Sequence, residues 1–120
     1  MSIESIENKV TEVKIEDLKK KYAGQKVYEI GHTVQIDDET EDTFSFLFRK
    51  PLPLTYDRYL KTASKSMSSA SRAFVLDNVV TEQTGGLIAT LEEYPAMAIT
   101  VAEKLLKMLG LGDNTTVKKL

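Results

Sequence analysis

Few residues in this chain have the types and spacing that catalysis requires. His32 is its single histidine, and the 120 residues include no cysteine. An enzyme needs an acid–base pair, a nucleophile with its base, or a cluster of metal ligands. A lone histidine with no second histidine and no cysteine to partner it is more typical of a packed or surface residue. We therefore expect a protein without enzymatic activity.

The acidic run at residues 37–42, with the sequence DDETED, is the strongest candidate for a metal site. A calcium loop needs oxygen ligands at alternating positions, a glycine at its sharp turn and a final bidentate glutamate. The run lacks that order, so we interpret it as an exposed acidic turn that limits aggregation.

Two further features could suggest a binding or catalytic role. Gly85–Gly86 is followed by neither Lys-Ser nor Lys-Thr, as a phosphate-binding loop would require. Asp77 has no carboxylate partner nearby in sequence and is interpreted as a polar group that caps or bonds backbone near a buried helix end. The sequence thus predicts no cofactor and no metal.

Composition indicates one globular domain. The hydrophobic fraction is 42%, the charged fraction 28%, and the net charge −2. Lysine and arginine are spread along the chain, which argues against nucleic-acid binding. No apolar run reaches the roughly 20 residues that span a bilayer, and the first ten residues do not form a signal peptide. Together with the absence of cysteine, these features favour a cytoplasmic protein without membrane contact.

The apolar spacing predicts an α+β fold that begins with a helix and a β-hairpin. Residues 15–23 form a helix that Gly24 ends, and its three lysines at 19–21 are expected to be solvated. Residues 27–36 and 43–48 alternate as two antiparallel strands, with Phe44, Phe46 and Phe48 on one face. Gly31 suggests either a bulge in the first strand or a close approach of another backbone.

A longer helical pattern follows at residues 54–80. Its apolar residues recur at steps of three and four, which predicts one helix of five turns with Thr55 as its N-cap: Tyr56, Leu60, Ala63, Met67, Ala70 and Phe74. Five serines in residues 64–71 mark the place where it could bend or break.

A bundle of about three C-terminal helices is expected in all. Residues 81–86 are expected to be a loop, followed by a short helix to Tyr94, then Pro95, then a helix from Ala98 that ends in a Schellman motif at Gly110. The domain would span residues 15–111. Residues 1–14 would form a disordered or docking arm, and residues 112–120 a flexible polar tail.

Several segments resemble the small tail assembly chaperones of tailed phages and prophages, in their short form. The segments are FSFLFRKPLP, YDRYLKTASKS, AFVLDNVV and LEEYPAMAITVAEKLLKMLGL, within residues 26–120. The resemblance implies a non-catalytic protein of the bacterial host cytoplasm that binds the tape measure protein. It also implies recruitment of tail tube protein, through a longer frameshifted form, and absence from the finished virion.

The exposed hairpin edges and the apolar stripes further predict a homo-oligomer. The residues expected to contact partners are Phe44, Phe46, Tyr56, Tyr59, Met67, Ala70, Met97 and Val101. Two alternatives remain open at this point: a structural virion protein such as a tail completion or connector subunit, and another small oligomeric protein-interaction domain.

Overall fold

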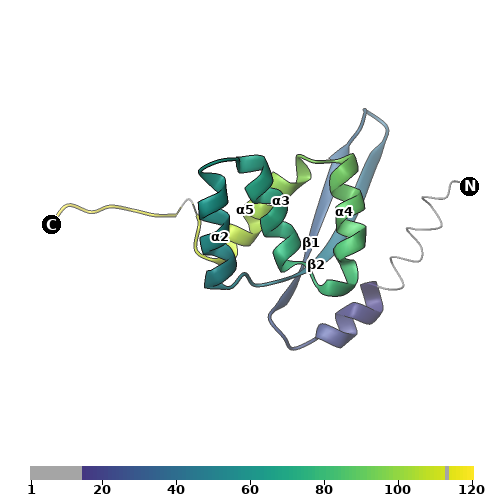
Figure 1. The fold of residues 1–120 in the computed structure, drawn as a ribbon, viewed down its shortest axis with the longest axis horizontal. Coiled ribbons are helices and arrows are strands. Elements are labelled where there is room, and N and C mark those ends of the chain that lie inside the picture. The colour runs from purple at the N-terminus through teal and green to yellow at the C-terminus, as the bar shows by residue number, and fades with distance from the viewer. Residues whose placement is uncertain (1–14, 113) are drawn as a thin grey trace, which may run out of the picture.

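The predicted α+β fold is confirmed by a computed structural model, which describes residues 15–112 and 114–120. A helix at residues 15–22 precedes an antiparallel β-hairpin, and helices complete the domain (Figure 1). The arm predicted at residues 1–14 lies outside the described residues. The elements after the first helix are β1 (Val27–Gln35), β2 (Glu41–Arg49), α2 (Pro53–Ala63), α3 (Met67–Asn78), the 3₁₀ turn η1 (Thr81–Gln83), α4 (Thr84–Glu93) and α5 (Met97–Met108).

The two strands pair without interruption along their whole length. His32 lies opposite Phe44, and Gly31 opposite Ser45. The bulge predicted at Gly31 is therefore wrong. A Cβ atom at this position would lie 3.6 Å from Ser45 Oγ, which is an ordinary contact distance. The space around Gly31 is therefore that of a regular strand position.

The faces of β2 contribute to two different hydrophobic clusters, because successive side chains on a strand point in opposite directions. Phe46 and Phe48 pack into the main core with α3, α4 and α5. Leu47, on the opposite face, packs with Leu18 and Tyr22 of the first helix and with Val80. Both faces of this half of the hairpin are thus covered. The main core consists of Phe46, Phe48, Phe74, Val75, Val79, Leu87, Leu91, Met97, Ala98, Val101, Ala102 and Leu105.

The single helix predicted over residues 54–80 is wrong, because the chain breaks between α2 and α3 within the serine-rich stretch. Ser66 has extended backbone angles, and its Oγ accepts a hydrogen bond from the Ser69 N–H at 3.3 Å, which makes it the N-cap of α3. Serine favours this position because its side chain satisfies a backbone donor that the first turn leaves free.

The break lets α2 fold back beside α3 (Figure 1). The rings of Tyr59 and Phe74 lie 4.8 Å apart between centroids. Arg58 Nη1 lies 3.1 Å from Asp77 Oδ2, so Asp77 joins the two helices by an ion pair. The structural interpretation of Asp77 holds, but its partner is a side chain and not the backbone.

Two other boundaries differ from the prediction. Helix α2 begins at Pro53, whose missing N–H costs nothing in the first turn, and the Thr55 hydroxyl donates to the Leu52 carbonyl at 3.0 Å. Thr55 is therefore not the N-cap. Gly85 and Gly86 lie in the first turn of α4 and not in a loop. Burial of Leu87 and Leu91 on the core-facing side of α4 offsets the low helix propensity of these glycines.

The end of α5 agrees with the prediction. Gly110 has a φ of 109°, and the Leu111 N–H donates to the Leu106 carbonyl at 3.1 Å, which confirms the Schellman motif. Glu103 and Lys107 form an ion pair of 3.7 Å one turn before it. The described residues after Leu111 contain no helix or strand and extend away from the domain (Figure 1). None of the helices described here is long and apolar enough to cross a membrane.

The first helix is held to the rest of the domain by polar contacts as well as by Leu18 and Tyr22. Lys21 Nζ lies 2.8 Å from Glu82 Oε2, and the Tyr22 hydroxyl donates to Glu82 Oε1 at 2.8 Å. Lys19 pairs with Glu29 at 3.1 Å. Lys19 and Lys21 were expected to be solvated, but they tie the helix to β1 and η1. The hydrogen bond from Lys21, followed by one from the Glu82 backbone N–H and one from Tyr22, lowers the pKa of Glu82 to about 2.

Acidification is expected to weaken this attachment. Because the pKa of Glu82 falls from 4.5 to about 2 on folding, its contribution to stability is complete above pH 4.5 and is lost as the pH falls toward 2. The difference in free energy of unfolding between wild type and Glu82→Gln should therefore shrink over this interval. Urea titrations at a series of pH values measure it. A difference that stays constant from pH 6 to pH 2 would contradict the lowered pKa of Glu82. Glu93→Gln, on the exposed surface of α4, serves as the control.

Candidate interaction surface

The described residues offer no arrangement typical of an active site. His32 lies half-buried on β1 opposite Phe44. Within residues 15–112 and 114–120, no three His, Cys, Asp or Glu side chains gather where they could hold a metal ion.

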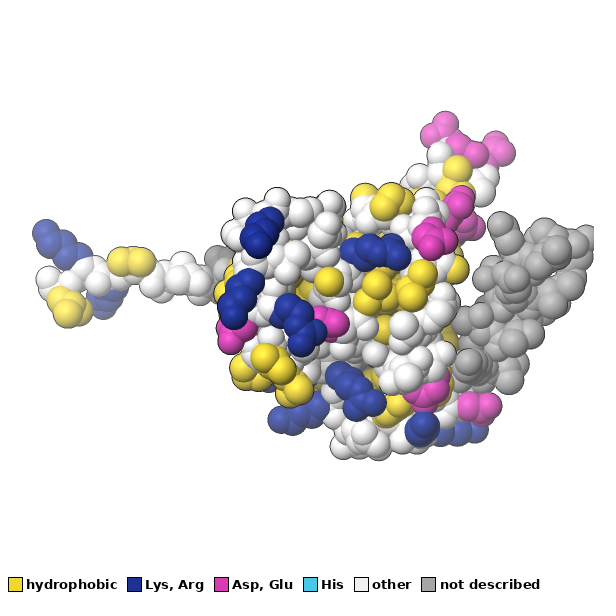
Figure 2. Space-filling model, in the orientation of Figure 1, with side chains coloured by type: hydrophobic (Ala, Val, Ile, Leu, Met, Phe, Trp, Pro, Cys, Tyr) yellow, Lys and Arg dark blue, Asp and Glu magenta, His cyan; other side chains and the backbone are white. Residues whose placement is uncertain are grey.

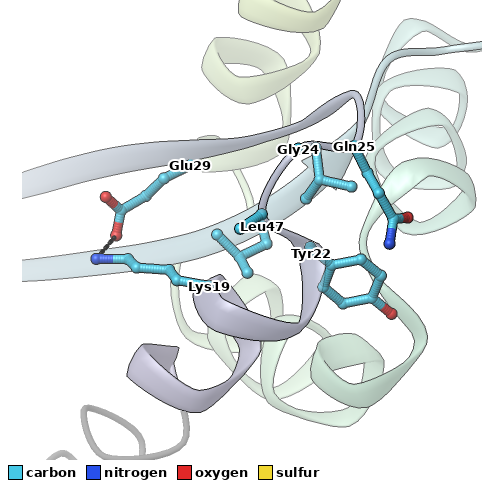
Figure 3. A pocket seen from close by; sticks show the side chains of 8 residues that line it. Lys19, Tyr22, Gly24, Gln25, Glu29 and Leu47 are labelled. Carbon is cyan, nitrogen blue, oxygen red and sulfur yellow. Dashed lines mark ion pairs between the residues drawn. The ribbon is translucent and has the colours of Figure 1, made fainter.

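A shallow hollow of about 250 Å³ lies between the first helix and the start of β1 (Figure 3). Tyr22 and Leu47 contribute apolar walls, while Lys19 and Glu29 line it with charge. These two charged groups pair with each other at 3.1 Å, as the dashed line in Figure 3 marks. The two charged side chains of the hollow are therefore already paired with each other, which makes the hollow a poor binding site for a polar small molecule.

Helix α2 is the most unusual element of the surface. None of its residues is buried, although a helix of a small domain normally covers core with its apolar stripe. Leu54 is 67% exposed and Leu60 47% exposed. We define the α2 surface as a set of exposed apolar side chains on and next to this helix. It includes Leu52, which precedes α2, and Met67, which begins α3. The full set is Leu52, Leu54, Tyr56, Leu60 and Met67. Tyr56 and Leu60 lie one turn apart on one side of α2, and exposed apolar patches mark interaction sites.

The chain segment that contains the α2 surface is rich in basic residues. Residues 49–72 include six lysine or arginine residues and one acidic residue, Asp57. Arg58 pairs with Asp77, whereas Lys61 and Lys65 are exposed beside the apolar side chains. Figure 2 shows lysine and arginine side chains distributed over this end of the molecule. An apolar surface with a basic border suits a protein segment that carries apolar and acidic residues together.

The eight residues predicted to contact partners fall into three groups. Phe46, Ala70, Met97 and Val101 are buried in the domain and unavailable to a partner while it stays folded. Phe44 and Tyr59 are half-buried: the Phe44 ring lies 5.5 Å from that of Tyr94, and the Tyr59 hydroxyl lies 3.4 Å from Met67 Sδ. Tyr56 and Met67 are exposed and belong to the α2 surface.

Sequence reasoning did not assign Leu52, Leu54 and Leu60 to the surface, although they are among its most exposed apolar side chains. Leu60 belongs to the predicted stripe, but helical spacing alone does not say whether that side of the helix is exposed. Leu52 and Leu54 alternate with Pro51 and Pro53. This alternation indicates exposed leucines. Proline has no N–H to donate to a neighbouring strand, so no strand covers the leucines beside it.

Comparison with known proteins identifies a family and one related structure. A family model described as a domain of unknown function, DUF6848, matches residues 18–118. A solved structure of an uncharacterised protein from Bacillus stearothermophilus is 27% identical, with a TM-score of 0.68, over 87% of this chain and 99% of that one. The search of curated proteins gave no match.

Proposed function

The chain belongs to the DUF6848 family, and we propose that it is a tail assembly chaperone of a phage or prophage that binds the tape measure protein. The observation that carries the proposal is the α2 surface, which belongs to a helix without a single fully buried residue. The resemblance of residues 26–120 to such chaperones supplies the identity of the partner. The protein acts in the host cytoplasm without catalysis.

The α2 surface accounts for how such a chaperone would act. A tape measure protein is long and helical, and its apolar stripes aggregate until the tail encloses them. Tyr56 and Leu60 lie one turn apart on one side of α2 and can contact such a stripe, because apolar side chains spaced along one helix fit the groove of another. Met67 adds a flexible side chain that adapts to different sequences. Recruitment of tail tube protein belongs, in this proposal, to a longer frameshifted form.

Co-expression tests the proposal directly. The tape measure gene of the same phage or prophage is expressed with and without this chain, and soluble tape measure protein is measured after lysis. We expect a larger soluble fraction with the chain present and co-purification of the two proteins. Unchanged solubility together with no complex at any stoichiometry would overturn the proposal.

The structural virion protein considered above predicts a different result. Mass spectrometry of finished particles separates the two, because a chaperone leaves before the tail is complete and a connector subunit remains. Detection of this chain in purified particles at a fixed copy number would replace the chaperone with the structural role.

A further inference from the structure

The tip of the β-hairpin, residues 36–42, combines an apolar side chain with concentrated negative charge. Ile36 is 51% exposed, and five of the six residues that follow it are acidic. Asp37 Oδ1 accepts hydrogen bonds from the N–H groups of Glu39 and Thr40, each at 2.8 Å, and these bonds lower the pKa of Asp37. The turn therefore presents the exposed side chains of Asp38 and Glu39 on an ordered support.

The α2 surface offers the complementary combination. Its apolar side chains stand beside Lys61 and Lys65, so it matches an acidic segment that also carries an apolar residue. The two regions lie at opposite ends of the domain: α2 is at the left of Figure 1, and the tip of the hairpin is at the upper right. Figure 2 shows acidic side chains gathered at that tip and basic ones over α2 and α3.

We propose that the hairpin tip of one copy of this chain docks on the α2 surface of a second copy. Ile36 packs against Tyr56 and Leu60 of the second copy, while Asp38 and Glu39 face its Lys61 and Lys65. Charge complementarity between two surfaces of the same chain is the argument for this occupant. Because the surfaces are different and lie at opposite ends, the contact is head-to-tail and builds a ring or an open chain of copies.

This contact goes beyond the proposed function, since it requires no tape measure protein and is tested on the purified full chain alone. Because it uses Tyr56 and Leu60, a second copy and the tape measure protein would compete for the α2 surface. We expect wild type to associate with increasing concentration, and less so at high salt because screening weakens the charge pairs. Sedimentation velocity measures the association. Asp38→Lys/Glu39→Lys and Lys61→Glu/Lys65→Glu should each raise the dissociation constant at least tenfold, since each variant places like charges on both surfaces.

Mixing these two variants gives the decisive result. In an equimolar mixture, the basic tip of Asp38→Lys/Glu39→Lys meets the acidic α2 surface of Lys61→Glu/Lys65→Glu. The unchanged acidic tip of the second variant meets the unchanged basic α2 surface of the first. Association should therefore return to near the wild-type level. Lys118→Glu/Lys119→Glu, the same charge change in the tail, should associate like wild type, and circular dichroism checks that every variant is folded. A wild type that stays monomeric at its solubility limit, or a mixture that fails to restore association, would overturn the proposal.

Discussion

Replacement of Phe48 by alanine is expected to lower the free energy of unfolding by about 3–5 kcal/mol. Phe48 is fully buried, with 0% of its surface exposed, in the main core between β2 and helices α3 to α5. Its strand also pairs with Val79 through an isolated bridge. Removal of the ring leaves a cavity that the paired strand cannot close, because its backbone is fixed by hydrogen bonds. For a domain whose total stability is about 5–15 kcal/mol, this loss threatens folding itself.

Phe44→Ala is the matched control for this prediction. Phe44 lies on the same strand and the same face, but it is half-buried, and its ring lies 5.5 Å from that of Tyr94 between centroids. We expect a loss of about 1–2 kcal/mol, since less surface returns to water and less volume is left empty. Urea unfolding followed by circular dichroism measures both variants. Equal losses would show that the buried end of β2 is no more important to stability than the open end.

The hairpin could be predicted because its signals are local. Phe44, Phe46 and Phe48 alternate with polar or differently directed residues, and the acidic turn cannot pack inside a domain. The Schellman ending at Gly110 was equally accessible, since a glycine followed by leucine after an apolar stripe specifies both the left-handed residue and its contact. In these segments, sequence and tertiary structure favour the same conformation.

The helix break is a different case, because two signals in the sequence compete there. The stripe through Tyr56, Leu60, Met67 and Ala70 keeps helical spacing across the serines, so periodicity alone continues the helix. Ser66 as an N-cap favours a new start at Met67. What decides between them is long-range: folding back places Tyr59 on Phe74 and Arg58 on Asp77, contacts that a straight helix could not make.

The partner-binding residues could be predicted only in part for a related reason. Apolar spacing identifies one side of a helix but does not say whether core or solvent lies beside it. Ala70 and Val101 are buried because α3 and α5 pack on each other, whereas the equally regular Tyr56 and Leu60 lie on a helix at the edge of the domain. Burial therefore separates residues that the sequence placed in one group.

Loss of the apolar side chains at this edge should separate function from stability. For Tyr56→Ser/Leu60→Ser we expect the affinity for the tape measure protein to fall at least tenfold, or about 1.4 kcal/mol or more, because tyrosine and large aliphatic anchors dominate such interfaces. The free energy of unfolding should change little, by about 1 kcal/mol or less, since both side chains are already exposed in the domain. Pull-down with purified tape measure protein measures the affinity, and urea unfolding measures the stability.

Tyr28→Ser/Ile99→Ser is the matched control for this prediction. It also removes one exposed tyrosine and one exposed aliphatic side chain, 44% and 48% exposed, but on β1 and α5 and outside the α2 surface. If general surface hydrophobicity kept the tape measure protein soluble, both double variants would lose affinity to the same degree. Selective loss in Tyr56→Ser/Leu60→Ser would place the contact on α2, where the domain leaves a whole helix without a buried side chain.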